Sequence, residues 1–387
     1  MTVRKFFKSF SFLSLMAASA LHATNGDQMI ATGTKSMGMG GVSVAMPFGA
    51  ESGLANPALI TYVEHSEISG SATLFFPDIK TKTNRDNTFH KSDSNFYLMP
   101  AVQYATHLGG KAYAGLGVWG VAGMGVDFSD APSGPLNGSG LLQMKDDLMI
   151  MHIAAPLALK EGGMSIGIAP ILQVGMLDIE MLGSKVIDKD WEANPSAVIG
   201  LAYDFNNGLI VGAKYRTPIS MDYDMKSGGS LSLQQPGELG IGFSYTYGPH
   251  TLAFDYKRVQ WGSADGYSDF GWRSQDVYAV GYQYRTENWA LRFGYNHGKS
   301  PIPTGSTETL EDYFNLLGFP ATSKDHYTIG GTYTIDKEFS LDLAAVYSPE
   351  VTTSGQLVGK NPNFAINEFI TNKHSEFSLT AQLNYKF

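Results

Sequence analysis

The sequence predicts an all-β fold: a transmembrane antiparallel β-barrel of about 14 strands with an N-terminal hatch, or plug, inside the lumen. Three observations predict it. Apolar and polar residues alternate with a period of two from Glu64 onward, as in strands that have one wet and one apolar face. Short turns alternate with longer polar connections. Residues 24–62 follow neither the strand period nor the helix period.

Residues 1–23 have the features of a secretory signal peptide. A basic region with Arg4, Lys5 and Lys8 precedes an apolar stretch over residues 10–20, which is too short to span a bilayer as a helix, and small residues follow. The formal net charge is −9, so losing these three basic residues would leave −12. This acidic balance argues against a nucleic-acid partner, and the absence of Cys excludes disulfide bonds.

Residues 24–62 are rich in Gly, Met and Ala and poor in charge. Near their end, Asn56, Pro57 and Ala58 match a helix start, with Asn as the cap and Pro at the first helical position. An irregular apolar segment needs surroundings that satisfy its backbone polar groups. We therefore expect residues 24–62 to form a hatch that is enclosed by a barrel of residues 63–387.

The alternation is clearest at the end of the chain. In residues 375–387 the apolar positions are Phe377, Leu379, Ala381, Leu383, Tyr385 and Phe387. In an outer-membrane barrel such a face contacts lipid. Short turns are predicted at 108–111, 161–163, 206–208, 248–250, 286–288 and 336–338, and longer connections at about 80–94, 127–143, 183–194, 225–235, 262–273, 299–324 and 351–374. Short turns on one side and long loops on the other are typical of these barrels.

The stretch 111–128 holds Gly115, Gly117, Gly120 and Gly123, a density that weakens regular pairing and favours bulges. We expect this strand to be distorted; close packing of the plug against small residues is the alternative. Residues 115–120 also match GxGxxG, but no helix follows, which excludes a dinucleotide site.

Strand parity places Lys214, Arg216 and Arg292 toward the lumen, together with Asp255 and Asp342. Two interpretations are open: these charges pair among themselves, or an unpaired cation binds an anionic head group.

In the stretch 307–317, Leu310, Phe314 and Leu317 fall on one helical face. They predict either a loop helix packed on the barrel rim or an external apolar groove. No catalytic constellation or metal-ligand spacing stands out, so we expect no enzyme activity, no cofactor and no metal site.

The chain resembles the FadL-type outer-membrane transporters of long-chain fatty acids and other hydrophobic compounds. The matching stretches are the Gly-rich N-terminus that ends in Asn56-Pro57-Ala58, then 214–218 (KYRTP), 299–303 (KSPIP) and 385–387 (YKF). The resemblance implies a monomeric barrel of about 14 strands, embedded in the lipid of the bacterial outer membrane, with an external groove and a tighter lumen site. It also implies release through a side opening beside a kinked strand.

On this resemblance we expect passive uptake of hydrophobic molecules, with long-chain fatty acids favoured over neutral hydrocarbons and a general porin as the least favoured alternative. The expected lumen ligands are Lys214, Arg216 and Arg292, and the expected external groove is Leu310, Phe314 and Leu317. The expected side opening lies at Gly115, Gly117, Gly120 and Gly123.

Overall fold

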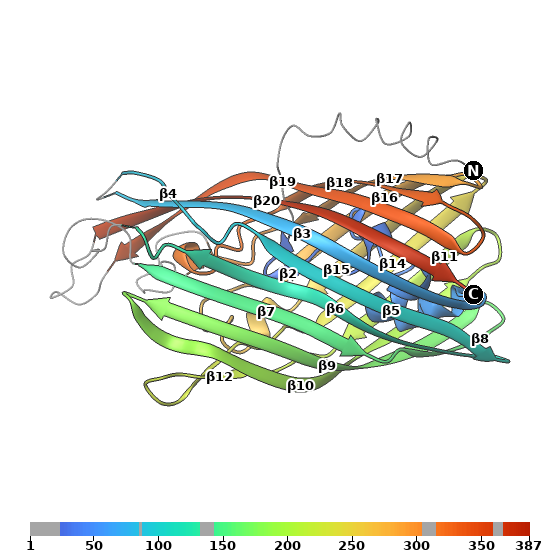
Figure 1. The fold of residues 1–387 in the computed structure, drawn as a ribbon, viewed down its shortest axis with the longest axis horizontal. Helices are drawn as coiled ribbons and strands as arrows, with labels where there is room; N and C mark the ends of the chain where they lie inside the picture. The colour runs from blue at the N-terminus through green and yellow to red at the C-terminus, as the bar shows by residue number, and fades with distance from the viewer. Residues whose placement is uncertain (1–23, 85–86, 132–142, 304–314, 359–366) are drawn as a thin grey trace.

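The computed structural model describes residues 24–84, 87–131, 143–303, 315–358 and 367–387, so the predicted signal peptide lies outside the described residues. Within these ranges, antiparallel strands close into a 14-strand barrel (Figure 1), which confirms the predicted fold class. The wall strands are β3 (Ser66–Thr83), β5 (Tyr97–Gly109), β6 (Ala112–Asp127), β7 (Met144–Ala154) with β8 (Leu157–Glu161), β9 (Met164–Met181), β10 (Ser184–Asp204), β11 (Leu209–Arg216), β14 (Glu238–Tyr247), β15 (His250–Val259), β16 (Gln275–Arg285), β17 (Trp289–Gly298), β18 (Asp325–Thr334), β19 (Phe339–Val358) and β20 (Asn367–Lys386).

The barrel closes because β20 pairs with β3 over most of its length, from Ile370–Thr83 to Lys386–Glu67. The strands β7 and β8 form one wall strand that is interrupted at residues 155–156, since both pair with β6 and β9. Smaller elements lie in the connections: β4 (His90–Lys91), β12 (Asp222–Asp224), β13 (Ser230–Ser232) and the 3₁₀ turn η4 (Trp261–Ser263). No helix among the described residues is long and apolar enough to span a membrane.

The outer surface of the wall is apolar, as lipid contact requires. Alternate side chains along each strand are exposed and hydrophobic, including Leu98, Leu116, Ile166, Leu239 and Ile241. Aromatic side chains form contacts between strands near both ends of the wall, among them Tyr284–Trp289 and Phe339–Tyr385 near the short turns and Tyr256–Tyr278 and Tyr295–Tyr327 toward the other end. These rows correspond to the interfacial girdles of membrane barrels.

All six predicted short turns join consecutive wall strands in the structure. Two of the predicted long connections are wrong. At 183–194 a tight turn at Leu182 and Gly183 joins β9 directly to β10, and at 351–374 the strands β19 and β20 extend far into the expected loop. The polar residues in both places pair as strand residues instead. Polarity alone misidentified these strand segments because their apolar residues, such as Ile187 and Ile370, are few and scattered.

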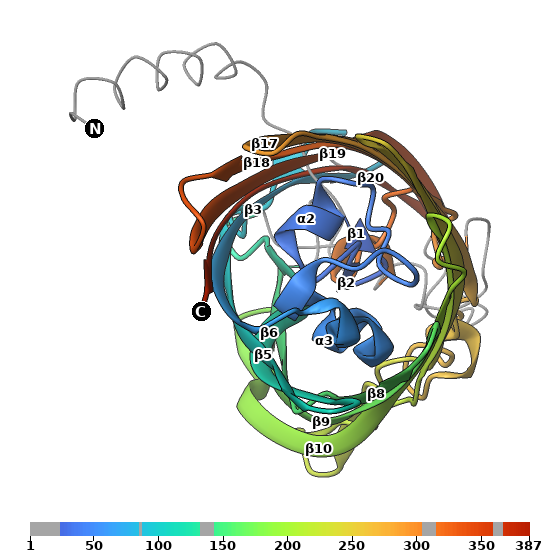
Figure 2. The same ribbon diagram turned by 90° about the vertical axis from the view of Figure 1, so that its right-hand side faces the viewer.

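The N-terminal segment lies inside the ring of strands (Figure 2). It contains β1 (Thr24–Asn25), β2 (Gln28–Met29), α2 (Thr34–Met37), η2 (Gly49–Glu51), α3 (Ser52–Ala55) and η3 (Pro57–Tyr62). The cap predicted at Asn56 is present: its side-chain oxygen accepts a hydrogen bond from Ala58 N at 3.1 Å, and Pro57 begins η3. The Asn56 amide also donates to Val44 O at 2.7 Å and to the wall at Leu201 O at 3.2 Å.

Buried charges of the wall satisfy the backbone of this segment. The Asp255 carboxylate accepts hydrogen bonds from Ser43 N at 2.6 Å and Val44 N at 2.9 Å. Two positions along β15, Lys257 donates to Gly41 O at 2.9 Å and Ile30 O at 3.3 Å. An irregular backbone inside a barrel needs such partners, because it has no ladder of its own.

Wall glycines make room for the segment. A Cβ atom at Gly294 would lie 2.0 Å from Gly40 N, and one at Gly212 would lie 2.3 Å from Val44 O. Similar backbone contacts occur at Gly167, Gly281 and Gly330. The glycines of several strands are therefore explained by the close approach of a second backbone.

Replacing Gly294 with Ala should loosen the enclosed segment. The added methyl overlaps backbone atoms of Gly40, which cannot yield as a flexible side chain can, so we expect a loss of about 1–3 kcal/mol in the stability of the docked segment. Faster proteolysis within residues 24–62 of the folded protein would report it. The control is Gly70→Ala, where no described atom lies within 4 Å of the new methyl; equal proteolysis of both variants would contradict the prediction.

Candidate functional site

The wall has an unpaired stretch between β5 and β6. As far as the described residues show, the β5–β6 ladder ends at the pair Ala101–Trp119, although β6 continues to Asp127. The two sides meet again only near Asp127, whose carbonyl accepts from Asp93 N at 2.9 Å. The wall therefore lacks β5–β6 backbone pairing along residues 120–126 of β6, and this unpaired stretch is the opening between the two strands.

Local sequence explains why the ladder stops there. On β5, Pro100 has no N–H to donate, and Pro disrupts strand pairing. On β6, the register against β7 shifts between Gly120 and Ala122, so Val121 is bulged. The distortion predicted for this glycine-rich strand is thus present.

The N-terminal segment occupies the inner side of this opening. Gln28 of β2 pairs with Ala122 of β6, and Gly123 N donates to Asp27 O at 3.0 Å. The backbone groups on this edge of β6 are therefore partly hydrogen-bonded by residues 27–29 rather than by β5.

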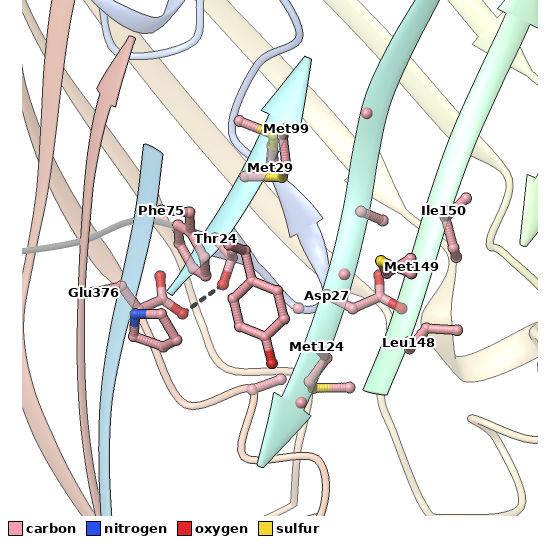
Figure 3. Close-up of a pocket in the computed structure, with 18 of the residues that line it drawn as sticks. Thr24, Asp27, Met29, Phe75, Met99, Met124, Leu148, Met149, Ile150 and Glu376 are labelled. Atoms are coloured by element: carbon pink, nitrogen blue, oxygen red, sulfur yellow. Dashed lines mark hydrogen bonds between the residues drawn. The ribbon is translucent and has the colours of Figure 1, made fainter. Parts of the chain in front are cut away.

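A cavity lies at this opening (Figure 3). It offers about 160 Å³ of free space. Its inner lining includes the buried residues Leu148 and Ile150, whereas Leu98 and Trp191 on its outer side face lipid. It therefore connects the barrel interior to the lipid-facing surface. Five methionines line it, namely Met29, Met99, Met124, Met149 and Met151, and their flexible, polarisable side chains adapt to varied apolar ligands.

Two carboxyl groups give this wall cavity a polar side. Thr24 Oγ1 donates to Glu376 Oε1 at 2.6 Å (Figure 3), and Asp27 Oδ2 accepts from Gln235 Nε2 at 2.9 Å and from the Tyr267 hydroxyl. Burial raises the pKa of Asp27 to about 6, although the hydrogen bonds from Tyr267 and Gln235 act in the opposite direction.

A second, smaller cavity lies on the other side of β2. Met29 lines both cavities, so β2 separates them. The predicted lumen residues Lys214 and Arg216 line this inner cavity, with Lys257 and Glu238. Lys214 Nζ lies 2.7 Å from Glu238 Oε1, Arg216 Nη2 lies 3.7 Å from Glu238 Oε2, and Arg216 also donates to Gln28 Oε1 at 2.9 Å.

These contacts show Lys214 and Arg216 paired through Glu238, a residue that sequence parity did not single out. Arg292 lies elsewhere: it is buried, its Nε donates to Gln283 Oε1 at 2.8 Å, and its Nη1 lies 3.8 Å from Asp342 Oδ1. The structure therefore groups Lys214 with Arg216 but not with Arg292. Head-group binding by these cations stays a prediction.

The four predicted opening glycines divide into two pairs. Gly120 and Gly123 line the wall cavity. Gly115 and Gly117 lie in the paired part of β6, opposite Ala105 and Gln103, and line neither described cavity. The structure thus narrows the candidate opening to Gly120 and Gly123.

The predicted external groove receives no structural support. Leu310 and Phe314 lie outside the described residues. Leu317 is fully buried within the largest hydrophobic cluster and lines neither described cavity. At this residue the structure agrees with the alternative, a helical turn packed against the barrel.

Sequence reasoning missed the residues that make the wall cavity distinctive, Met29, Asp27, Pro100 and Glu376. For Glu376 a signal existed, because it occupies an inward position in the alternation of the closing strand. The other three carried no local pattern. Among the described residues, no group of three or more His, Asp or Glu side chains is placed to hold a metal ion.

A closed antiparallel barrel with an apolar outer belt, aromatic rows and short turns at one end defines an outer-membrane β-barrel protein. A model of the Gram-negative porin family matches residues 183–355. These findings place the chain in the bacterial outer membrane. No curated protein sequence matches the chain significantly.

Solved structures of FadL-type channels share the fold. The toluene transporter TodX of Pseudomonas putida is 16% identical, with 92% of this chain and 99% of that chain covered and a TM-score of 0.72. A Pseudomonas aeruginosa FadL homologue is 14% identical (95% and 100% covered, TM-score 0.71), and the Ralstonia pickettii toluene transporter TbuX is 15% identical (92% and 98% covered, TM-score 0.66). The resemblance predicted from the sequence is therefore confirmed at the level of the fold.

Proposed function

We propose that the chain is a passive outer-membrane channel for small hydrophobic molecules, which acts as a monomer and releases its substrate sideways through the opening between β5 and β6. The observation that carries this proposal is the apolar cavity that spans the wall where the β5–β6 ladder stops. Transport through the wall spares a hydrophobic molecule from the aqueous periplasm, and each methylene kept from water is worth about 0.8 kcal/mol.

Residues 24–62 act as the hatch in this proposal. Their contacts with Asp255, Lys257 and the wall glycines support a docked segment that closes the lumen below the wall cavity. A substrate that enters from outside then reaches the wall cavity beside residues 24–29 of the hatch, which line its inner side, and leaves sideways there. No catalytic step is part of this function.

Uptake measurements test the proposal directly. Cells that express the chain should accumulate radiolabelled toluene or a labelled long-chain fatty acid faster than cells with an empty vector. A polar solute of similar size, such as glycerol, should show no such gain. Equal gains for polar and apolar solutes would indicate a general porin instead.

The substrate class depends on the inner cavity. If a fatty acid is carried, its carboxylate would bind Arg216 with help from Lys214, at the cost of loosening their ion pairs with Glu238. Two of the similar structures are toluene transporters, which supports a neutral single-ring molecule as the second candidate.

Arg216→Ala separates the two candidates. If the carboxylate interpretation holds, the variant should lose affinity for a long-chain fatty acid by about tenfold or more, since a charge-assisted bond of ~1.5–3 kcal/mol is removed, while its methyl ester binds as before. Binding is measured on purified protein after heat-dependent gel migration confirms a folded barrel. Equal losses for acid and ester, or none, would exclude Arg216 as the head-group ligand.

A further inference from the structure

The wall cavity has a polar side that an entirely apolar ligand would leave unsatisfied. We propose that this cavity selects uncharged single-ring molecules that carry a hydroxyl group, such as alkylphenols, and discriminates against carboxylates of the same size. This inference rests on the proposed function and specifies the substrate class of the same site.

The size of the cavity fits one ring. Its free space is about 160 Å³, and an apolar protein cavity of roughly 150 Å³ is known to bind benzene. The lining is dominated by apolar side chains, including five methionines, so the ring has favourable contacts on most sides.

The charges that line the cavity disfavour an anion. Its ionisable lining residues are Asp27, Tyr97, His374 and Glu376, and no Lys or Arg is among the described lining residues. The cations Lys214 and Arg216 belong to the inner cavity, beyond Met29. A carboxylate ligand in the wall cavity would therefore meet carboxyl groups rather than a guanidinium.

His374 does not supply a net positive charge either. Its Nδ1 lies 2.7 Å from Pro320 O, which can only accept, so Nδ1 carries a proton. Its Nε2 lies 3.2 Å from Glu376 Oε1, a contact that needs one further proton between the two groups. Whichever group holds that proton, the His374–Glu376 pair is neutral overall.

Two carboxyl groups at the cavity each keep one oxygen without a direct hydrogen bond. Asp27 Oδ1 is buried without a donor, and Glu376 Oε2 makes no direct hydrogen bond although the Ser323 hydroxyl lies close to the Glu376 carboxyl group; each residue is only 1% exposed. The other oxygen of each carboxyl group accepts hydrogen bonds: Glu376 Oε1 accepts from Thr24, and Asp27 Oδ2 accepts from Gln235 and Tyr267. Buried acceptors of this kind normally accept a hydrogen bond. A ligand hydroxyl can donate one to them and so gain binding free energy, which a methyl group cannot do.

Three ligands of matched shape test this selection: toluene, p-cresol and p-toluate, which differ only in hydrogen, hydroxyl or carboxylate opposite the methyl group. At pH 7 the phenol is neutral and the carboxylate is ionised. In the wild-type protein in detergent, calorimetry should show p-cresol binding roughly three- to tenfold tighter than toluene, the range of one hydrogen bond, and p-toluate weakest.

Glu376→Gln removes the proton that Glu376 shares with His374 and one carboxyl oxygen but keeps the shape, and its amide can donate to a ligand. This variant should bind p-toluate more tightly than the wild type and should lose part of the preference for p-cresol over toluene. Asp27→Asn tests the second oxygen in the same way. The control is Asp276→Asn on β16, a carboxylate that pairs with Arg258 and lines neither described cavity. This variant should bind the three ligands in the same order of affinity as the wild type.

The outcomes separate this inference from the proposed function. The inferred preference for a hydroxylated ring is wrong if p-toluate binds wild-type protein as tightly as p-cresol. It is also wrong if Glu376→Gln and Asp27→Asn both leave the relative affinities of the three ligands unchanged. Neither result contradicts the proposed uptake of hydrophobic molecules. If none of the three ligands binds and no hydrophobic solute is taken up by cells, the proposed function itself fails.

Discussion

Deletion of residues 24–48 should raise the single-channel conductance at least severalfold. A barrel of 14 strands is wide enough to leave an aqueous lumen unless something fills it, and this segment lies inside the ring of strands (Figure 2). The deletion also removes the partners of Asp255 and Lys257, which leaves charges that favour water in the lumen. Planar-bilayer recording of the refolded variant measures the effect.

Gly294→Ala serves as a milder version of the same experiment, because it disturbs the hatch at Gly40 without removing any residue. It should show brief openings that Gly70→Ala does not show. An unchanged conductance in the deletion variant, with normal heat-dependent gel migration, would rule out residues 24–48 as a plug.

Gly123→Phe should abolish most hydrophobic uptake while leaving the barrel folded. Around a Cβ atom at Gly123 the nearest described contact is Leu148 O at 3.0 Å, and no other described contact lies within 4 Å. A phenyl ring can therefore extend into the wall cavity after a small adjustment and fill the space that a substrate needs. Uptake of labelled toluene by cells is the measurement.

The matched control is Gly70→Phe, which adds the same ring to an exposed position on β3 where no described atom lies within 4 Å. It should transport normally. Normal transport by Gly123→Phe as well would show that substrates leave by another route, and the lateral exit would have to be abandoned.

Sequence pattern predicted the fold because each wall strand carries its own signal. Alternation and turn chemistry are local, so the six short turns and the strand count followed from neighbouring residues. The errors at 183–194 and 351–374 arose where apolar residues such as Ile187, Trp191 and Ile370 are few and scattered, which weakens that local signal.

The candidate site was predicted only in part, because its geometry depends on contacts between distant residues. The distorted strand could be predicted, since its glycines are adjacent in sequence. Arg216 and Glu238 lie opposite each other on β11 and β14, whereas the hydrogen bond from Arg216 to Gln28 and the meeting of Asp27 and Glu376 in one cavity depend on how the hatch docks. No spacing along the chain encodes those contacts.

The seam between β3 and β20 has a consequence for biogenesis. Ser66 and Phe387 exchange two backbone hydrogen bonds, of 3.1 and 3.0 Å, and Thr24 contacts Glu376 across 352 positions of sequence. The two edges that must meet are thus nearly the whole chain apart, and contacts of such long range form slowly. Until they meet, both edges expose unpaired backbone groups that invite association with other chains. The assembling protein therefore needs its edges sheltered until the last strand arrives.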